Sequence, residues 1–293
     1  SCIEGFVVIA GTRLLISILI ANWFDKLRGL ALSIALSGSG VGGVVMTLLT
    51  SHFIAAYGWR TTFLILAVIT FICAFPLTFA LYTRPSDLGL LPYGAANTGT
   101  KSGQEQVQTY GVGSKTAVRS TAFWVLMIGF FLMGLIAGAV IMNVAATFTD
   151  AGHTALFASR IVSLELFVVI FGKLILGSVY DRLGLVSGTV LGSVTTILAT
   201  VSLLFADTLV APFLFALFFG FGTCLGTVAP PIMVIYEFGR RDSGSLIGYV
   251  TAIEMVGGAI GSICMGRLYD VTGSYAFGWM VLTVLGVIMA ITL

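Results

Sequence analysis

The chain of 293 residues is 58% hydrophobic and only 9% charged, and its formal net charge is +2. An ordinary soluble domain carries roughly 25% charged residues, so this composition excludes a water-soluble globular protein. No cluster of lysine and arginine is dense enough to indicate a nucleic-acid partner.

Long apolar segments recur along the whole chain, and the short segments between them hold nearly all of the charge. A helix needs about 20 residues to cross the hydrocarbon core of a bilayer. We therefore predict an all-α polytopic membrane protein that has the lipid bilayer as its surroundings. The predicted spans are 3–22, 29–55, 60–83, 121–147, 157–181, 184–206, 209–237, 243–269 and 275–293.

One long polar stretch, residues 84–120, separates the third span from the fourth. It is rich in Gly, Ser, Thr and Gln, as flexible linkers are. We predict three parts: residues 1–83 with three spans, a linker over 84–120, and residues 121–293 with six spans.

The basic residues predict the orientation, because cytoplasmic loops carry an excess of lysine and arginine. One side holds nine of the 14 basic residues, the other holds three, and two fall inside spans. The linker side is therefore expected to be cytoplasmic, in the plasma (inner) membrane. The nine are Lys26, Arg28, Arg84, Lys101, Lys115, Arg119, Arg182, Arg240 and Arg241, the three are Arg60, Arg160 and Arg267, and the two are Arg13 and Lys173.

A short internal repeat links residues 177–184, GSVYDRLG, with residues 266–273, GRLYDVTG. The offset of 89 residues covers three spans, so the two copies end on opposite sides of the membrane. This arrangement is typical of the inverted three-helix repeats of transporters.

Three motifs carry a family resemblance: WFDKLRGLA at 23–31, GWR at 58–60 and RPSDLGLLPYG at 84–94. With them the chain resembles the major facilitator superfamily, in particular its monocarboxylate and oxalate/formate branch. The resemblance implies a helical bundle in which the nine spans are helices 4 to 12 of twelve. Residues 1–83 would then be what is present of the first half, and the chain, which begins at Ser1 without methionine, is expected to be a piece of a longer protein.

Residues 177–184 resemble the later copy of this family's loop motif, which implies a role in gating rather than substrate contact. Asp181 and Arg182 would pair with neighbouring helix ends and hold one conformation of the rocking bundle. The simpler alternative is a charged helix end that only fixes topology.

Lys173 is the strongest candidate for substrate binding, because a charge at the bilayer centre costs about 2.5–3.5 kcal/mol and must face a cavity or a partner. The resembled branch usually has a basic residue at this position that binds a substrate carboxylate. The alternatives are a structural ion pair and a side chain that snorkels to the interface.

Glu254 lies in the apolar stretch 249–263. Burial favours the neutral form of a carboxyl group, so proton uptake is possible near neutral pH. An acid here departs from the oxalate-exchanging relatives, which have a lysine nearby, and fits a monocarboxylate accompanied by a proton. The alternative is that Glu254 merely neutralises Lys173.

Three further polar residues lie within spans. Asn143 is a candidate for substrate binding, although hydrogen bonding between helices is the commoner use of such residues. Arg13 is a further candidate for substrate binding, and the alternative for it is a structural role. Glu165 is eight residues from Lys173, about 80° away around the helix, and we expect it to be peripheral.

Other signals point to structure rather than chemistry. The GxGxxG spacing at 38–43 lies inside an apolar span without the βαβ context that dinucleotide binding needs. We expect it, and the glycine pairs at 134–138, 222–226 and 257–261, to pack helices closely. The four cysteines are expected to be buried small residues, and Pro230-Pro231 is expected to break or kink its helix.

The charge asymmetry, the inverted repeat and the two ions within apolar spans, together with the family resemblance, predict a secondary transporter that works by symport or antiport. No catalytic or metal-ligand constellation is visible, so no cofactor or metal is expected. The predicted substrate is a small organic anion, accompanied by a proton. The alternative is a proton-coupled exporter of neutral or cationic small molecules.

Overall fold

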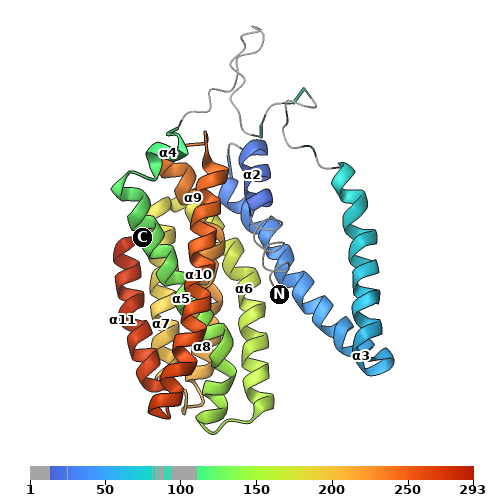
Figure 1. Cartoon of the computed structure of the whole chain (residues 1–293), viewed down its shortest axis with the longest axis vertical. Helices are drawn as coiled ribbons and strands as arrows, with labels where there is room; N and C mark the ends of the chain where they lie inside the picture. Colours follow the sequence, from blue (N-terminus) through green and yellow to red (C-terminus); the bar gives the residue numbers. More distant parts are fainter. Residues whose placement is uncertain are drawn as a thin grey trace.

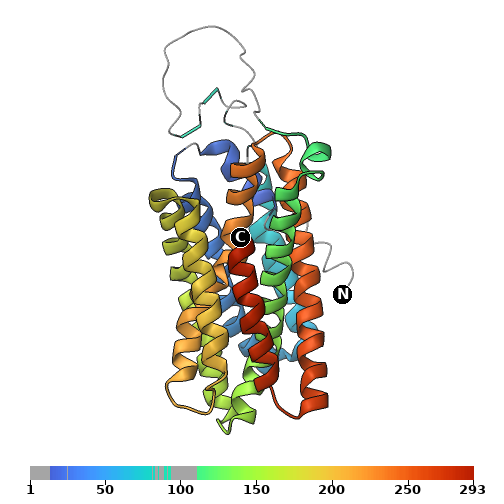
Figure 2. The ribbon, with the colours of Figure 1, turned by 90° about the vertical axis from the view of Figure 1, so that its left-hand side faces the viewer.

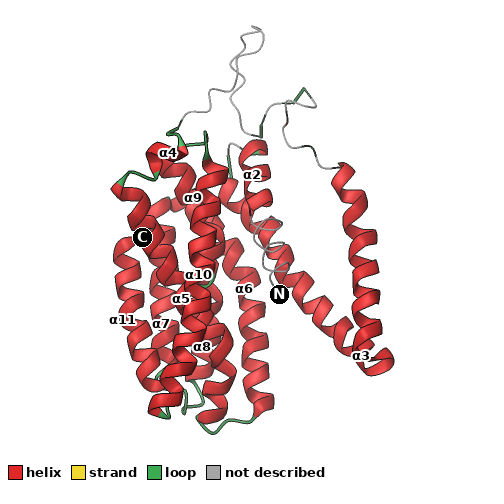
Figure 3. Cartoon of the chain, in the orientation of Figure 1, coloured by secondary structure: helices red, strands yellow, loops and turns green. Residues whose placement is uncertain are grey.

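The structure is a computed structural model that describes residues 14–24, 26–80, 82, 85, 89, 90, 92, 93 and 111–293. Within these residues the elements are helices joined by loops, and no strand is formed (Figure 3). Six helical stretches of this described part are long and apolar enough to cross a membrane. The prediction of an all-α membrane bundle is thereby confirmed.

The predicted spans correspond to helices, most of which run roughly along one common axis, while the second span runs obliquely to it (Figures 1 and 2). The part of the first span that is described is α2 (Leu14–Trp23), and the second and third spans form α3 (Arg28–Ala80). The remaining spans are α5 (Thr121–Asp150), α6 (Ala155–Leu183), α7 (Leu185–Leu203), α8 (Ala211–Gly222) with α9 (Cys224–Phe238), α10 (Ser243–Thr272) and α11 (Ala276–Thr292).

The long helix α3 is two helices joined at Gly58. This glycine has φ 73° and ψ 164°, a left-handed conformation that a side chain would strain. The second arm of α3 stands apart from the bundle in Figure 1, and its Phe63, Leu64 and Phe71 are more than 60% exposed. Such a face is stable in lipid, where apolar side chains need no protein partner.

The seventh span is divided, but not where the proline pair predicts. Helices α8 and α9 are separated by the single residue Thr223, whose own dihedrals are helical, while Pro230 and Pro231 lie inside the helical α9. The expectation of a break at the prolines is therefore wrong, and the alternative expectation of a kink stays a prediction. The prolines withhold N–H groups from the carbonyls of Gly226 and Thr227 without interrupting the helical dihedrals.

Helices α5 and α10 cross closely. A Cβ at Gly134 would overlap the carbonyl oxygen of Glu254, and a Cβ at Gly261 would overlap that of Leu135. Backbones approach this closely only where both helices present small residues. The packing role predicted for the glycine pairs 134–138 and 257–261 is confirmed.

Gly261→Ala is expected to lower the melting temperature in detergent by the equivalent of about 1–3 kcal/mol, because the added methyl group overpacks the crossing. Gly266→Ala on the same helix is the matched control, since a Cβ there meets nothing within 4 Å. It is expected to be neutral or slightly stabilising. Equal melting temperatures for the two variants would contradict this packing argument.

The cysteines differ from expectation. Cys224 is buried in the core, but Cys73 and Cys264 are exposed on the helix surface, so the prediction of burial is wrong for these two. A thiol behaves as a small apolar group and is tolerated on a lipid-facing surface. Cys2 lies outside the described residues.

The last part of the linker is attached to the bundle. The N–H of Val112 donates to the carbonyl of Phe238, and Asp242 accepts from the N–H of Ser114 at 2.7 Å. Ser114 begins the short helix α4 (Ser114–Ala117). The backbone and hydroxyl hydrogen bonds from Ser114 hold the pKa of Asp242 below its usual value. We call this end of the bundle the linker end and the opposite one the far end (Figure 1).

Candidate functional site

Lys173 lies in the middle of α6, which is a regular helix of 29 residues capped at its start by the hydroxyl of Thr154. The side chain is 6% exposed. Its Nζ donates to the main-chain carbonyl of Leu36 on α3 at 3.1 Å. The buried ammonium group predicted from the sequence therefore lies at the interface between α3 and the bundle, and not on the lipid surface.

The interface between α3 and α6 is closed at the linker end. The contacts, in order from that end, pair Gly29 with Gly177, Ser33 with Gly177, Leu36 with Lys173 and Gly40 with Ile170. Beyond Gly40 the side chains of Val45 and Met46 are 46% and 40% exposed. The two helices thus separate toward the far end, as Figure 1 shows, and Lys173 lies near the last contacts.

Asp181 fastens this interface at the linker end. Its Oδ1 accepts from the N–H of Gly29 at 2.9 Å, and its Oδ2 accepts from the N–H of Leu30 at 2.7 Å. These are among the first N–H groups of α3, which have no partner within the helix and attract negative charge. The carboxylate of one helix therefore caps another helix about 150 residues away in the chain.

Arg182 does not share this arrangement. It is exposed and makes no hydrogen bond or ion pair with any residue for which a position is described. It borders a shallow hollow of about 370 Å³ on the outer face of α6, together with Leu174, Ser178 and Leu183. Of the two residues predicted to act in gating, Asp181 therefore binds a neighbouring helix, whereas Arg182 binds none of the described residues.

Glu254 is 8% exposed on α10. Its Oε1 lies beside the backbone of Gly226 on α9, so close that a Cβ at Gly226 would come within 2.5 Å of it. The side chain of Met133 on α5 borders the same glycine. The carboxyl group therefore lies where α5, α9 and α10 meet.

The other two predicted substrate-binding residues receive less support. Asn143 is 9% exposed, and its Nδ2 donates to the carbonyl of Ala139 one turn earlier on α5, at 2.9 Å. No described contact joins it to Lys173 or Glu254. Arg13 lies outside the described residues.

Glu165 is the residue that the sequence-based reading missed. It is 8% exposed, so the prediction of a peripheral position is wrong. The thiol of Cys224 on α9 lies within electrostatic reach of both Glu165 and Lys173. The signal that could have identified it was its position within an apolar stretch, the criterion that selected Lys173.

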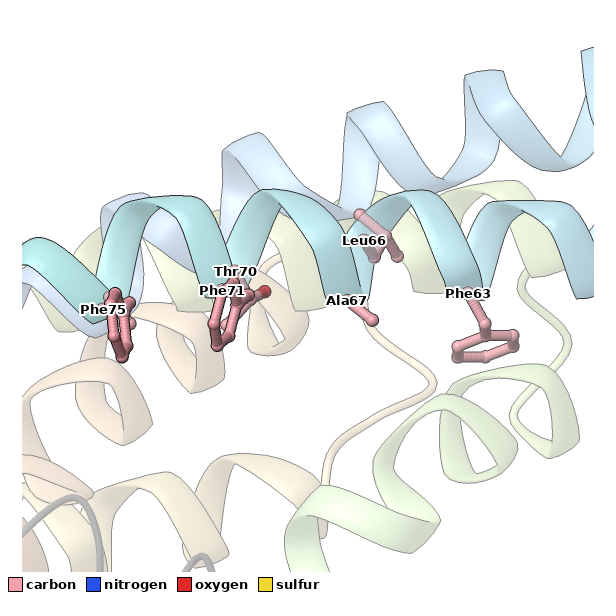
Figure 4. Close-up of a pocket in the computed structure, with 7 residues that line it drawn as sticks. Phe63, Leu66, Ala67, Thr70, Phe71 and Phe75 are labelled. Atoms are coloured by element: carbon pink, nitrogen blue, oxygen red, sulfur yellow. The ribbon is translucent and has the colours of Figure 1, made fainter.

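One hollow among the described residues lies on the second arm of α3. It has a volume of about 650 Å³ and is lined by Phe63, Leu66, Ala67, Thr70, Phe71, Ala74 and Phe75 (Figure 4). Its lining offers one hydroxyl group and no charge. It therefore has no group that could hold an anion, and we do not place a substrate there.

No three His, Cys, Asp or Glu side chains come together as a metal site within the described part of the chain. The buried ionisable groups on α6, α9 and α10 instead include one ammonium group, two carboxyl groups and one thiol, held by Lys173, Glu165, Glu254 and Cys224. Chemically, this set can bind ions and protons.

Comparisons with known proteins agree with this description. A family model described as "Major Facilitator Superfamily" matches residues 2–262. The chain is 24% identical over 261 residues to "MFS transporter asaE" of Aspergillus flavus, covering 87% of this chain and 54% of that protein. It is 23% identical over 254 residues to "Uncharacterized MFS-type transporter YhjX" of Escherichia coli, covering 83% of this chain and 57% of that protein.

A shorter match joins the chain to "Riboflavin transporter RibJ" of Trypanosoma cruzi, at 44% identity over 43 residues, or 15% of this chain and 9% of that protein. All three relatives are named as transporters and none as an enzyme. The chain spans little more than half the length of the two relatives that it matches most extensively.

Proposed function

Because the chain belongs to the Major Facilitator Superfamily, we propose that it forms part of a secondary active transporter that moves a small organic anion, such as a monocarboxylate, by alternating access. The observation that carries the anion assignment is the burial of Lys173 in the middle of a membrane-spanning helix. A buried ammonium group attracts a carboxylate, and it is retained in a membrane helix at a cost of about 2.5–3.5 kcal/mol.

The position of Lys173 suits a carrier, because it lies at the interface that must open and close. Its hydrogen-bond acceptor on α3 is a neutral carbonyl oxygen. A substrate carboxylate would form a charge-assisted hydrogen bond with the ammonium group, roughly twice as strong as a neutral one. The anion would therefore compete with α3 for Lys173 and connect binding with movement of the two helices.

Asp181 supports the second element of the proposal, a gate at the linker end. In the conformation described, the α3–α6 interface is closed at this end and separates toward the far end. We infer that the linker end faces the cytoplasm, from the excess of basic residues there, and that the protein resides in the plasma membrane. The conformation is then closed to the cytoplasm, and Asp181 stabilises it.

Glu254 is proposed to carry a coupled proton. The residue is 8% exposed within a membrane-spanning helix, and its Oε1 lies beside the backbone of Gly226. An ionisable side chain at this depth is costly to retain and is typical of a proton relay.

Glu254→Gln is expected to weaken the stimulation of uptake by an imposed pH gradient, because glutamine mimics the protonated acid and cannot release a proton. Uptake at equal pH on both sides is expected to persist. Glu237→Gln, at an exposed carboxyl group near the end of α9, is the control and should leave the stimulation unchanged. A Glu254→Gln protein that responds to the gradient as strongly as the unmodified protein would exclude this role.

The anion proposal is tested with the full-length protein that contains this chain, purified and reconstituted into liposomes. We expect saturable uptake of radiolabelled lactate, inhibited by other monocarboxylates and not by the uncharged analogue lactamide. Equal inhibition by lactamide would show that the carboxylate is not what the site recognises.

One observation favours a second candidate, a proton-coupled exporter of neutral or cationic molecules. Among the described residues, two buried carboxyl groups, Glu165 and Glu254, accompany one buried ammonium group. Such a balance also suits a cationic substrate. Transport of radiolabelled tetraethylammonium, without inhibition by any monocarboxylate, would establish this candidate and exclude the first.

A further inference from the structure

Glu165 is buried without a counter-charge. Its side chain is 8% exposed in the middle of the membrane helix α6. Among the residues that the structure describes, none forms a hydrogen bond or an ion pair with its carboxyl group. An ionised carboxylate in such a place is strongly disfavoured, so the group needs either a proton or a cation that the described residues do not supply.

The helices packed against α6 provide no cation for it. Helices α7 and α8 contain no ionisable side chain. Helix α5 carries only Asp150, at its last residue, and α9 carries Cys224 near Glu165 and two ionisable groups at its far-removed end, Tyr236 and Glu237. Of the groups on these helices, Cys224 alone lies within electrostatic reach of Glu165.

Helix α3 and the rest of α6 also place no cation beside Glu165 among the described residues. Helix α3 has no acidic residue, and its ionisable groups are Arg28, His52, Tyr57, Arg60 and Cys73. The contact of α3 with α6 between Gly40 and Ile170 lies on the linker-end side of Glu165. On α6 itself, Arg160 is exposed and Lys173 is buried two turns away.

The position of Glu165 along α6 places its carboxyl group closer to the far end than Lys173 is. Glu165 is ten residues from the first residue of the helix, or roughly 15 Å, and eight residues from Lys173, or roughly 12 Å. It therefore lies between the far end and Lys173, where α3 has separated from α6. Along α6 from the far end, Glu165 therefore comes before Lys173.

We propose that Glu165 is a second proton-binding group of the carrier, which takes up a proton from the far end before the anion binds at Lys173. The direction of proton movement and the order of binding rest on the proposed function. The binding of a proton by Glu165 does not. The carboxylate accepts one proton and becomes a neutral carboxyl group, and it releases the same proton when the linker end opens. With Glu254 as the other proton carrier, two protons would accompany one monocarboxylate, and each cycle would move one net positive charge.

The test measures the protonated carboxyl group directly, without transport. Infrared difference spectra of the purified full-length protein are recorded during a pH titration, and the carbonyl-stretch band of a protonated carboxyl group in apolar surroundings is followed. We expect Glu165→Gln to remove one such band, Glu254→Gln to remove another, and Glu237→Gln to remove neither. If the spectrum of Glu165→Gln retains every band of the unmodified protein, the proposal is wrong.

Two additions keep the result interpretable. Glu165→Asp retains the acid, so it should shift the band rather than remove it, and it replaces Glu165→Gln if that protein elutes as aggregate on gel filtration. In liposomes, an inside-negative potential should stimulate lactate uptake by the unmodified protein and not by Glu165→Gln. Loss of the infrared band in a protein that transports no anion would leave the proton site standing and overturn the proposed substrate instead.

Discussion

Lys173→Ala is expected to reduce the transport efficiency for lactate, measured as kcat/KM in liposomes, by about 100-fold or more. Removal of one partner from a buried, hydrogen-bonded charge pair costs about 2–5 kcal/mol, and about 3 kcal/mol corresponds to 100-fold. The loss should fall on every accepted monocarboxylate, because the ammonium group binds the carboxylate that these substrates share.

Lys173→Arg separates loss of charge from loss of folding. Arginine keeps the positive charge and presents a planar fork that binds carboxylates with two hydrogen bonds, so substantial uptake should return. Arg160→Ala, which removes an exposed cation from the same helix, is the matched control and should have little effect. Unchanged rate and apparent affinity in Lys173→Ala, for all monocarboxylates tested, would remove the basis of the anion site.

A structural contribution of Lys173 is expected in addition, because its ammonium group also holds the carbonyl of Leu36. Lys173→Ala should therefore lower the melting temperature in detergent as well as uptake. Added lactate should raise the melting temperature of the unmodified protein, since a ligand that binds the folded state stabilises it. The same addition should leave Lys173→Ala unchanged.

Much of the fold was predictable, because the membrane imposes one strong rule on the sequence. Each spanning segment must satisfy its backbone internally and remain apolar, so apolar length alone locates the helices. The points where helices are interrupted were harder to predict. Gly58, whose backbone is left-handed, separates the two arms of α3. The other interruption lies at Thr223 and not at Pro230, because α9 remains helical at its two prolines although they have no N–H group.

The site was predictable where burial alone decides it. Lys173 and Glu254 each lie inside a long apolar stretch, and both are buried. Glu165 was missed because an angle on a helical wheel measures separation around one helix and not the width of its buried face. Helix α6 packs against five others, α3, α5, α7, α8 and α9, so its buried face includes residues 80° apart.

The partner of Asp181 could not be read from local pattern. The resemblance of residues 177–184 to a loop motif implied that Asp181 meets a neighbouring helix end, but not which one. The N–H groups that it binds, on Gly29 and Leu30, are 152 and 151 residues away in the chain. Only the packing of α3 on α6 brings them together.

Asp181→Ala is expected to shift the carrier toward the conformation that is open at the linker end, by about 30-fold. The carboxylate makes two hydrogen bonds with the first N–H groups of α3, and loss of a helix cap costs about 2 kcal/mol at most, which corresponds to about 30-fold. Asp181→Asn should show a smaller shift, because its amide oxygen can still accept one hydrogen bond.

The measurement is the labelling rate of a single cysteine at position 36, in a protein whose native cysteines are replaced. Leu36 is 6% exposed on the α3 face that contacts α6, so a membrane-impermeant maleimide reaches Leu36→Cys from the linker end only when that interface opens. We expect labelling to be about 10- to 30-fold faster with Asp181→Ala than without it.

Asp270 provides the control, because it occupies the same position in the second copy of the internal repeat. The two copies end alike, in Gly184 with φ 85° and Gly273 with φ 68°. Asp270 nevertheless lies at the far end of α10 and caps no helix in the described part of the chain. Asp270→Ala should therefore leave the labelling rate unchanged. An equal acceleration by both variants would show that loss of negative charge, and not loss of the cap on α3, opens the linker end.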